Sequence, residues 1–582
     1  MSFDGYTLRC LIDELNTELS GSRIEKIYQP ANDLLVINLR TKRGKDRLLI
    51  SANPSNPRMH LTEDYQFSAG HPPMFCMLMR KHFQNGIIAS ISQEGLDRVV
   101  IISVRATDEL GTTATKHIVV EIMGRHSNII LLDNNRIIID AAKRVSPEMS
   151  SYRQLHPGIL YKSPPGQHKL NMLTNSSEAL KQKLLECNGL SAEKAILNSL
   201  EGIGKLLATE ICYRSGIEPD AWLDSNNICR LLDTTETFRA VIFQSDYSPV
   251  IYYKSGRPQY FSAVLLTHLN LDSVKHDNVN RMVDSFFSEK LRREQLTQAK
   301  DGLERLVRGF LEKNMKKMAN QQEEYDNAQD YGVYRLYGEL LTANLFRLKE
   351  KADRAIVQNF YDADAKEIEI PLNPNLTPSE NAQRFFREYG RKKRTVENLS
   401  SHIENTKNEI QYLESLLFNI EKSTDMEMLA EIRSELLREG LIKDRDAKSG
   451  EKTPERSKPL RFISCDGLDI FVGKNNYQND YLTLKLAARD DLWLHTKDIP
   501  GSHVVIKAGN SEVPVSTLHQ GAMLAAFFSK GRHSSNVPVD YTEVKNVNKP
   551  SGAKPGMVVY RNNRTLFVTP DEELVNAIKR VE

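Results

Sequence analysis

Cysteine is scarce in this chain, and the few cysteines lie far apart. The 582 residues include six, namely Cys10, Cys76, Cys187, Cys212, Cys229 and Cys465. They form no CxxC pair and have no companion histidines at zinc-ligand spacing, which excludes a zinc-finger scaffold and favours free thiols in a reducing compartment. We therefore expect no metal site and no disulfide framework.

Long apolar runs and an excess of one charge are also missing. No stretch approaches eighteen apolar residues, and the N-terminal sequence MSFDGYTLRCLIDELNTEL lacks a basic segment followed by an apolar one. These absences predict a cytoplasmic protein with no membrane partner. The 78 Lys and Arg nearly balance the 76 Asp and Glu, so any contact with nucleic acid must come from locally basic surface.

The length predicts roughly three to five domains. Residues 1–170 begin with apolar residues at helical spacing and continue as short β-branched runs, which predicts an α+β domain. Residues 171–280 are helical in pattern, and LEGIGKLLATEI at 200–211 places a Gly-x-Gly turn between two helical segments. Such a helix-hairpin-helix turn is either a plain connection or a place where backbone N–H groups meet a phosphate.

Residues 281–440 carry the spacing of a coiled coil. The apolar positions alternate steps of four and three at Ala299, Leu303, Leu306 and Phe310, and again at Leu399, Ile403, Thr406, Ile410, Leu413, Leu417 and Ile420. Two long antiparallel helices, with the connector 331–378 at their tip, would produce this pattern, and so would pairing between two copies. A charged stretch at 441–458 predicts a linker.

The final domain, predicted at 459–570 and followed by a tail at 571–582, is locally basic. Between residues 456 and 570 there are 15 Lys and Arg against 9 Asp and Glu. The stretch DDLWLHTKDIPGSHVVIK at 490–507 groups an aspartate, a tryptophan and two histidines around a turn. It is either a buried strand hairpin or a surface that contacts RNA. The candidate contacts are Asp491, Trp493, His495, Ser502, His503, Lys545 and Lys549.

Four blocks resemble the NFACT family of ribosome-associated proteins. They are GLDRVV at 95–100, EIMGRHSNIILLD at 121–133, GELLTANLF at 338–346, and the C-terminal block that joins GKNNYQND at 473–480 to residues 490–507. The resemblance implies a multidomain α+β fold with an N-terminal α+β domain, a helix-hairpin-helix domain, a long antiparallel coiled coil and a C-terminal α+β RNA-binding domain. It also implies a factor that binds a large ribosomal subunit obstructed by peptidyl-tRNA and brings alanyl-tRNA, so that an untemplated alanine tail marks the nascent chain for degradation.

The same resemblance implies where tRNA binds. The family's Asp-Arg pair matches Asp97 and Arg98, whose side chains can accept from a base amine and donate to a phosphate or a guanine edge. A surface ion pair is the alternative for these two residues. The second block supplies polar groups around a glycine turn, which suits bases splayed from an RNA loop. Its candidate residues are Glu121, Ile122, Met123, Gly124, Arg125, His126, Ser127 and Asn128.

No catalytic group and no cofactor are expected, because ribosomal RNA would make the peptide bonds and the chain has no GxxxxGK[ST] phosphate loop. A small RNA-binding translocation partner is compatible with this reading. One alternative is a surface-associated adhesin that binds fibronectin. Another is a DNA-binding protein like the formamidopyrimidine glycosylases, although Ser2 replaces the expected N-terminal proline and a four-cysteine zinc finger is missing. A structural coiled-coil scaffold is the third.

Overall fold

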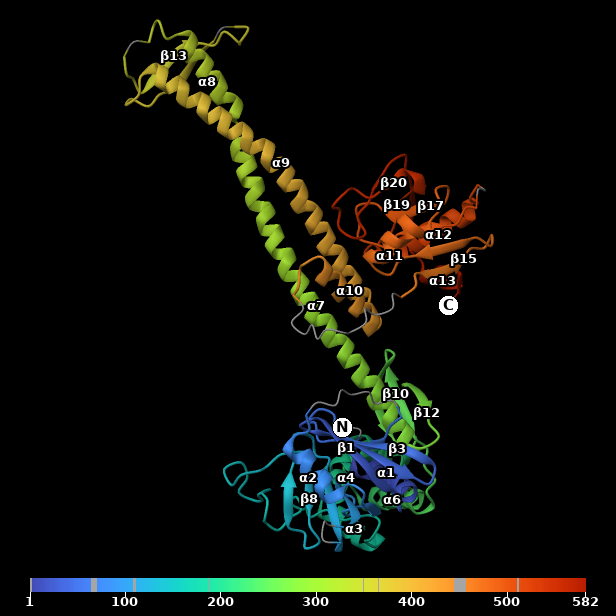
Figure 1. Cartoon of the computed structure of the whole chain (residues 1–582). Helices are drawn as coiled ribbons and strands as arrows, with labels where there is room; N and C mark the ends of the chain where they lie inside the picture. Colours follow the sequence, from blue (N-terminus) through green and yellow to red (C-terminus); the bar gives the residue numbers. More distant parts are fainter. Residues whose placement is uncertain are drawn as a thin grey trace. The chain divides into compact units, whose positions relative to one another are not determined.

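The computed structural model describes residues 3–63, 71–107, 111–187, 189–348, 350–364, 366–443, 457–509 and 512–581. The chain divides into two compact units, residues 1–293 and residues 294–582 (Figure 1). Most of the linker predicted at 441–458 lies outside the described residues. The mixed α+β fold class predicted from the sequence is confirmed.

Helix α1 (Gly5–Leu19) opens the first unit, as its apolar spacing predicts. The Asp4 carboxylate caps it by accepting a 2.8 Å hydrogen bond from the Thr7 amide. Its stripe of buried leucines packs on an antiparallel sheet. The strands are β1 (Arg23–Ala31), β2 (Leu34–Thr41), β3 (Gly44–Ser51), β4 (Arg58–Leu61), β5 (Ile87–Gln93), β6 (Val99–Thr107), β7 (Thr113–Glu121), β8 (Asn128–Leu132) and β9 (Ile138–Ala141), in the order β4-β3-β2-β1-β5-β6-β7-β8-β9.

The second half of this unit is mainly helical. It consists of α3 (Ser177–Glu186), α4 (Ala192–Ser199), α5 (Lys205–Arg214) and α6 (Ser225–Gln244), followed by strands β10 (Val250–Lys254), β11 (Arg257–Ser262) and β12 (Asp272–Lys275). Helix α2 (Met74–Phe83) comes earlier, between strands β4 and β5 in the sequence. The boundary predicted at residue 170 does not separate two compact units, because both sides share one core. For example, the Tyr6 hydroxyl donates a 2.8 Å hydrogen bond to the Phe238 carbonyl.

Two long helices begin the second unit. Helix α7 (Val279–Ala328) enters it from the first unit, and α9 (Pro378–Lys422) runs back alongside α7 (Figure 1). Hydrogen bonds join Asn327 to Lys392, Gln321 to Thr406 and Glu421 to Lys300. Because the residue numbers rise on one helix as they fall on the other, the pair is antiparallel and forms within a single chain.

The seam between these helices is the predicted one at most positions. Leu413 and Ile420 are buried, and Ala299 and Leu303 pack against them. The prediction for Leu306 was wrong, since its side chain is 37% exposed while Val307 beside it is fully buried. The inward position at this turn is therefore Val307 and not Leu306.

The connector lies at the tip of the two helices, as predicted. Helix α8 (Tyr331–Ala343) packs on α9, and the hairpin of β13 (Arg354–Gln358) and β14 (Glu367–Pro371) closes a small core with it (Figure 1). A capping box begins α9, in which Thr377 and Glu380 each bond to the other's backbone. Helix α10 (Met426–Arg438) then folds back against the two long helices.

The C-terminal domain is a sheet with one long covering helix. Its strands are β15 (Leu460–Ile463), β16 (Asp469–Val472), β17 (Leu492–Thr496), β18 (Val504–Ile506), β19 (Val537–Glu543), β22 (Arg564–Val568) and β23 (Lys579–Val581), in the order β22-β19-β17-β18-β16-β15-β23, and β20 (Val547–Asn548) pairs with β21 (Val559–Tyr560). Its helices are α11 (Asn476–Tyr481), α12 (Val515–Phe527) and α13 (Glu572–Ala577). The prediction that residues 571–582 form a tail was wrong. Strand β23 pairs with β15, and Val575 and Ile578 are buried in the core.

Candidate nucleic-acid interface

Three loops of the first unit enclose a polar cavity of about 340 Å³. The loop between β5 and β6 contributes Asp97 and Arg98, and the loop between α4 and α5 contributes the Gly202-Ile203-Gly204 turn. The segment 166–169 closes a third side. Two features that lie about a hundred positions apart in the sequence, the Asp-Arg pair and the helix-hairpin-helix turn, therefore line the same cavity.

Backbone contacts fix the Asp-Arg pair at the start of β6. The Asp97 carboxylate accepts a 2.7 Å hydrogen bond from the Arg98 amide, and the buried Gln93 side chain donates to the Asp97 carbonyl at 2.7 Å. The same Gln93 amide group also donates to the Gly5 carbonyl at 2.9 Å. Both side chains of the pair remain half-buried at the cavity wall. This arrangement holds Asp97 and Arg98 in place while leaving their side chains beside the cavity.

Glycine is needed where the helix-hairpin-helix turn meets the loop of Asp97. Gly202 has a φ of +73°, and a Cβ atom at this position would lie 2.4 Å from the Leu96 carbonyl oxygen. A Cβ on Gly5 would lie 1.8 Å from the same oxygen. Only residues without a side chain let the three segments approach this closely. The Gly204 amide donates to the Asp4 carboxylate at 3.1 Å, so this N–H group already has a partner inside the protein.

Charges of both signs gather around the cavity. Burial lowers the pKa of Lys169, and the nearby Arg98 lowers it further while Asp97 opposes the shift. Burial raises the pKa of Glu201, a hydrogen bond from the Leu96 backbone opposes this, and the Asp97 carboxylate adds to the rise. Lys205 lies at the exposed start of α5. The cavity thus offers cationic donors for phosphates and carboxylate acceptors for base amines.

The second predicted block lies directly beside this pair. Strands β6 and β7 align Val99 with Glu121, and the Ile122 amide donates to the Arg98 carbonyl at 2.8 Å. A short turn follows in which Gly124 has a φ of +59° and the Met123 amide donates to the Ser127 hydroxyl at 2.9 Å. The fold therefore brings the two tRNA-binding candidates of the N-terminal region together.

Not every residue of this block faces solvent. Glu121 is fully buried, and its carboxylate accepts hydrogen bonds from Arg153 at 2.8 Å and from the Tyr161 hydroxyl at 2.8 Å. Ile122, Gly124, Ser127 and Asn128 are buried as well, and Met123 is half-buried. Arg125 and His126 are exposed. Of the eight candidate residues in this block, Arg125 and His126 are therefore the ones accessible to RNA. Glu121 instead forms a buried ion pair with Arg153.

The four blocks quoted above lie within regions of the chain that match two family models. A family described as NFACT N-terminal and middle domains matches residues 4–455, and one described as NFACT protein RNA binding domain matches residues 458–562. The chain belongs to the NFACT family. It is 40% identical to the Rqc2 homolog RqcH of Bacillus subtilis and 38% identical to that of Streptococcus suis, in each case over all of both chains.

Other similar proteins match over part of this chain. The human ribosome quality control complex subunit NEMF is 26% identical over 61% of this chain and 33% of its own length. Among solved structures, the C-terminal part of the fibronectin/fibrinogen-binding protein from Streptococcus suis is 38% identical and covers 49% of this chain and 99% of its own, with a TM-score of 0.40.

In the NFACT RNA-binding domain, most of the predicted contact residues are buried. Trp493 is fully buried on β17, and Asp491, Ser502 and His503 are each at most 3% exposed. Asp491 holds the Lys507 ammonium at 2.6 Å and accepts from the Ala508 amide at 3.0 Å. The prediction that these four side chains form a surface for RNA was therefore wrong. They belong to a buried strand hairpin, which was the alternative.

A ring cluster surrounds Trp493. Its ring lies 5.2 Å from His503 and 4.8 Å from Tyr560, measured between ring centres, and it stacks 5.8 Å from the half-buried His495. Burial lowers the pKa of His495 to about 4 and that of His503 well below its usual value. Both histidines are therefore neutral at pH 7 and cannot attract a phosphate by charge.

The remaining predicted lysines already have acidic partners. Lys545 pairs with Glu543, and Lys549 pairs with Asp480 at 2.5 Å. Over the residues that the structure describes, no cluster of His, Cys, Asp and Glu has metal-binding geometry. Of the helices in that same part of the NFACT chain, none combines the length and apolar composition needed to cross a bilayer.

Residues Lys169, Glu201 and Lys205 line the NFACT cavity but were not predicted from the sequence. Lys169 and Glu201 lie in loops and Lys205 begins α5, and each carries an ordinary charged side chain that composition and spacing do not distinguish. The Gly-x-Gly turn was the one available signal, since Glu201 and Lys205 flank it directly.

Proposed function

We propose that this chain is a ribosome quality control factor that works in the cytoplasm. It binds a large ribosomal subunit still carrying peptidyl-tRNA and recruits alanyl-tRNA, so that an untemplated alanine tail marks the nascent chain. Similarity over the full length to proteins named Rqc2 homolog RqcH, and over part of the chain to NEMF, supports the ribosomal role. The cavity that unites Asp97 and Arg98 with the glycine turn is the observation that carries the tRNA role.

The cavity suits the loop of a folded RNA. Arg98 can donate two parallel hydrogen bonds to a phosphate or to a guanine edge, and Lys169 and Lys205 add charge for neighbouring phosphates. Asp97 and Glu201 can accept from exocyclic base amines, which phosphates cannot supply. Cations at the cavity position the RNA, and the carboxylates give preference among bases.

The chain needs no catalytic group of its own in this role. Ribosomal RNA makes the peptide bond, and the aminoacyl ester supplies the free energy. The work of the chain is to raise the local concentration of one tRNA beside the obstructed subunit, which is a binding function. We propose accordingly that it is not an enzyme and needs no cofactor.

The test replaces Asp97 and Arg98 together by alanine. We expect the double variant to lose tRNA binding by at least about ten-fold, because charge-assisted hydrogen bonds are each worth about 1.5–3 kcal/mol. Binding to purified large subunits should persist. Fluorescence anisotropy with labelled tRNA measures the first activity, and co-sedimentation with large subunits measures the second.

A matched control removes the same two charges elsewhere in the same unit. Asp277 and Arg281 form an exposed ion pair at 2.7 Å, with side chains 80% and 63% exposed. The Asp277→Ala, Arg281→Ala variant should bind tRNA like the parent protein. If it loses tRNA binding equally, or if the Asp97 and Arg98 variant keeps it, the proposed role of the cavity is wrong.

A further inference from the structure

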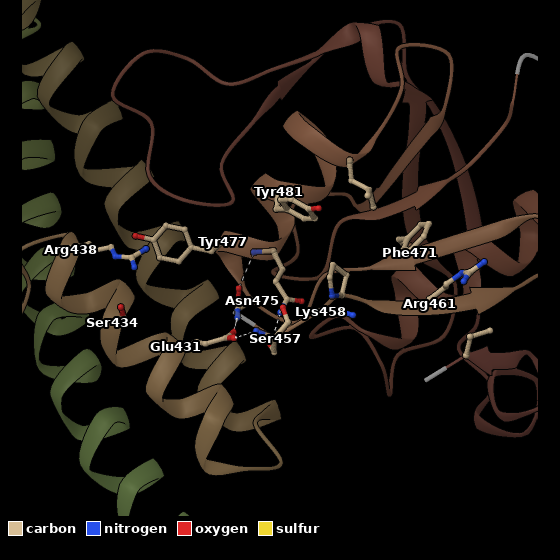
Figure 2. A pocket seen from close by; sticks show the side chains of 14 residues that line it. Glu431, Ser434, Arg438, Ser457, Lys458, Arg461, Phe471, Asn475, Tyr477 and Tyr481 are labelled. Atoms are coloured by element: carbon tan, nitrogen blue, oxygen red, sulfur yellow. Dashed lines mark hydrogen bonds between the residues drawn. The ribbon is translucent and has the colours of Figure 1, made fainter. Parts of the chain in front are cut away.

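A second, larger cavity lies in the other unit and has a different lining. Its volume is about 560 Å³, and its wall is formed by helix α10, the segment 457–459, strands β15 and β16, and helix α11 (Figure 2). None of the predicted RNA-contact residues lines it. A volume of this size fits one or two nucleotides or a ligand of similar bulk.

Aromatic side chains form much of this wall. Phe471 and Tyr477 are half-buried, and Tyr481 is 43% exposed (Figure 2). Phe471 comes from strand β16, both tyrosines come from α11, and all three side chains line the cavity. Rings that keep a free face beside a cavity are the usual platform on which unpaired bases stack.

The charges at this cavity are mainly positive. The Arg438 guanidinium lies 5.2 Å from the centre of the Tyr477 ring, and the exposed Lys458 is the last residue of the predicted linker (Figure 2). Arg461 also lines the cavity, although Asp469 pairs with it at 2.9 Å and 3.0 Å.

The acidic side chain in this lining has protein partners. Glu431 accepts from the Ser457 amide at 2.6 Å and from the Asn475 side chain, so its carboxylate fastens α10 to the domain (Figure 2). With Glu431 satisfied and Asp469 matched to Arg461, the cations Arg438 and Lys458 are left to attract an anion.

We propose that this cavity takes an unstacked base of single-stranded RNA between its aromatic rings, with the adjoining phosphates beside Arg438 and Lys458. Stacking surfaces and cations together match a nucleotide, which is both aromatic and anionic. An acidic peptide would match the cations but would leave the rings without planar partners. The region that matches an RNA-binding family begins at Lys458 and includes Phe471, Tyr477 and Tyr481.

This inference goes beyond the proposed recruitment of tRNA and does not depend on it. The two cavities belong to different units of the chain and share no residue. One cavity can therefore bind RNA even if the other does not.

The test uses the full chain with Asp97→Ala and Arg98→Ala already in place, which removes the first cavity from the measurement. The probe is a fluorescein-labelled single-stranded RNA of twelve nucleotides, followed by anisotropy. Tyr481→Ala should weaken binding by about ten-fold, and Tyr481→Phe should retain it, because stacking needs the ring and not the hydroxyl. Lys458→Ala should weaken binding less and should flatten its dependence on salt.

Phe567 supplies a matched control on the same sheet. It is 62% exposed on β22, at the opposite edge from β15 and β23, so Phe567→Ala removes an exposed ring away from the cavity. This variant should bind the RNA like the parent. Equal weakening by Phe567→Ala, or unchanged binding by Tyr481→Ala, would overturn the proposal.

Photo-crosslinking tests the same site without mutating the cavity, so its result does not depend on whether a variant folds. RNA that contains 4-thiouridine should crosslink to peptides carrying Phe471, Tyr477 or Tyr481 in the unmutated cavity, as read by mass spectrometry. Crosslinks confined to other peptides would contradict the proposal. So would displacement of the RNA by an equal concentration of a free mononucleotide, since that result identifies a small-molecule site.

Discussion

The cavity at Asp97 and the hairpin at Trp493 both contain polar residues that suggested RNA contact, but the fold leaves the first set at a cavity wall and buries most of the second. Asp97 and Arg98 lie half-buried at a cavity wall, while Trp493 and His503 lie in the interior of the C-terminal domain. The local sequences do not reveal this difference. It arises from what packs against each segment.

The neighbours explain the contrast. Asp97 and Arg98 precede β6 in a loop, and glycines on the facing segments keep bulky side chains away from it. Trp493 lies in a strand that pairs with β18 on one side and β19 on the other. A strand with partners on both edges has no exposed backbone, and its inward side chains become core whatever their chemistry.

The largest expected effect is on stability at the hairpin. Trp493→Ala removes a fully buried ring that contacts His503 and Tyr560, which should lower the stability of the C-terminal domain by about 3–5 kcal/mol. Differential scanning calorimetry of the full chain would measure it. Trp222→Ala is the control, since the chain's other tryptophan is 71% exposed and its loss should cost less than about 1 kcal/mol. Unchanged stability together with lost RNA binding in Trp493→Ala would show that the hairpin binds RNA. The difference between the hairpin and the cavity at Asp97 would then be wrong.

An intermediate effect is expected at the glycine turn of the first cavity. Gly202→Ala places a Cβ 2.4 Å from the Leu96 oxygen at a φ of +73°, which should cost about 1–3 kcal/mol and weaken tRNA binding by moving Asp97. Gly166→Ala lines the same cavity, but its added Cβ would meet nothing within 4 Å. Thermal unfolding and tRNA anisotropy on both variants would check this. If Gly166→Ala impairs binding as much as Gly202→Ala, the close crossing does not position the site.

The smallest effect is a pH dependence of the C-terminal domain. Burial lowers the pKa of His495 from about 6.5 to about 4, so the stability that the neutral ring contributes is complete above pH 6.5 and is lost as pH falls towards 4. Burial raises the pKa of Glu435 to about 7, and its contribution has the opposite sign, being lost as pH rises from 4.5 through 7. The stability advantage of the parent over His495→Gln should therefore shrink between pH 7 and pH 4.5. Urea unfolding at both pH values measures it, with His519→Gln on an exposed part of α12 as control. A difference that does not change with pH would show that folding does not lower the pKa of His495.

Local sequence patterns were sufficient to predict most of the helices and strands. The β-branched runs in the first 142 residues correspond to strands, because alternation and turn residues act at short range. Strand β4 (Arg58–Leu61) was missed because it is short and polar, and Arg58 and His60 are buried only through tertiary contacts. The tail at 571–582 was misread for the same reason, since its partner strand β15 lies more than a hundred residues earlier.

The candidate sites depended on long-range contacts that the sequence does not show. Family resemblance identified Asp97 and Arg98, but Lys169, Glu201 and Lys205 join them only through folding. Burial of Glu121 against Arg153 could not be read from a motif that looks polar throughout. The aromatic cavity of the C-terminal domain was also absent from the prediction, because Phe471 and Tyr481 are brought together as its lining only by folding.

The RNA that the protein carries in its native cells tests the proposed function most directly. Tagged parent protein and the Asp97→Ala, Arg98→Ala variant would be purified side by side, their bound small RNA sequenced, and ribosomal RNA of each subunit quantified. We expect the parent to enrich one tRNA together with large-subunit RNA and little small-subunit RNA, and the variant to retain only the large-subunit RNA. No RNA above background with the parent would contradict the proposed function and favour the adhesin or scaffold alternatives.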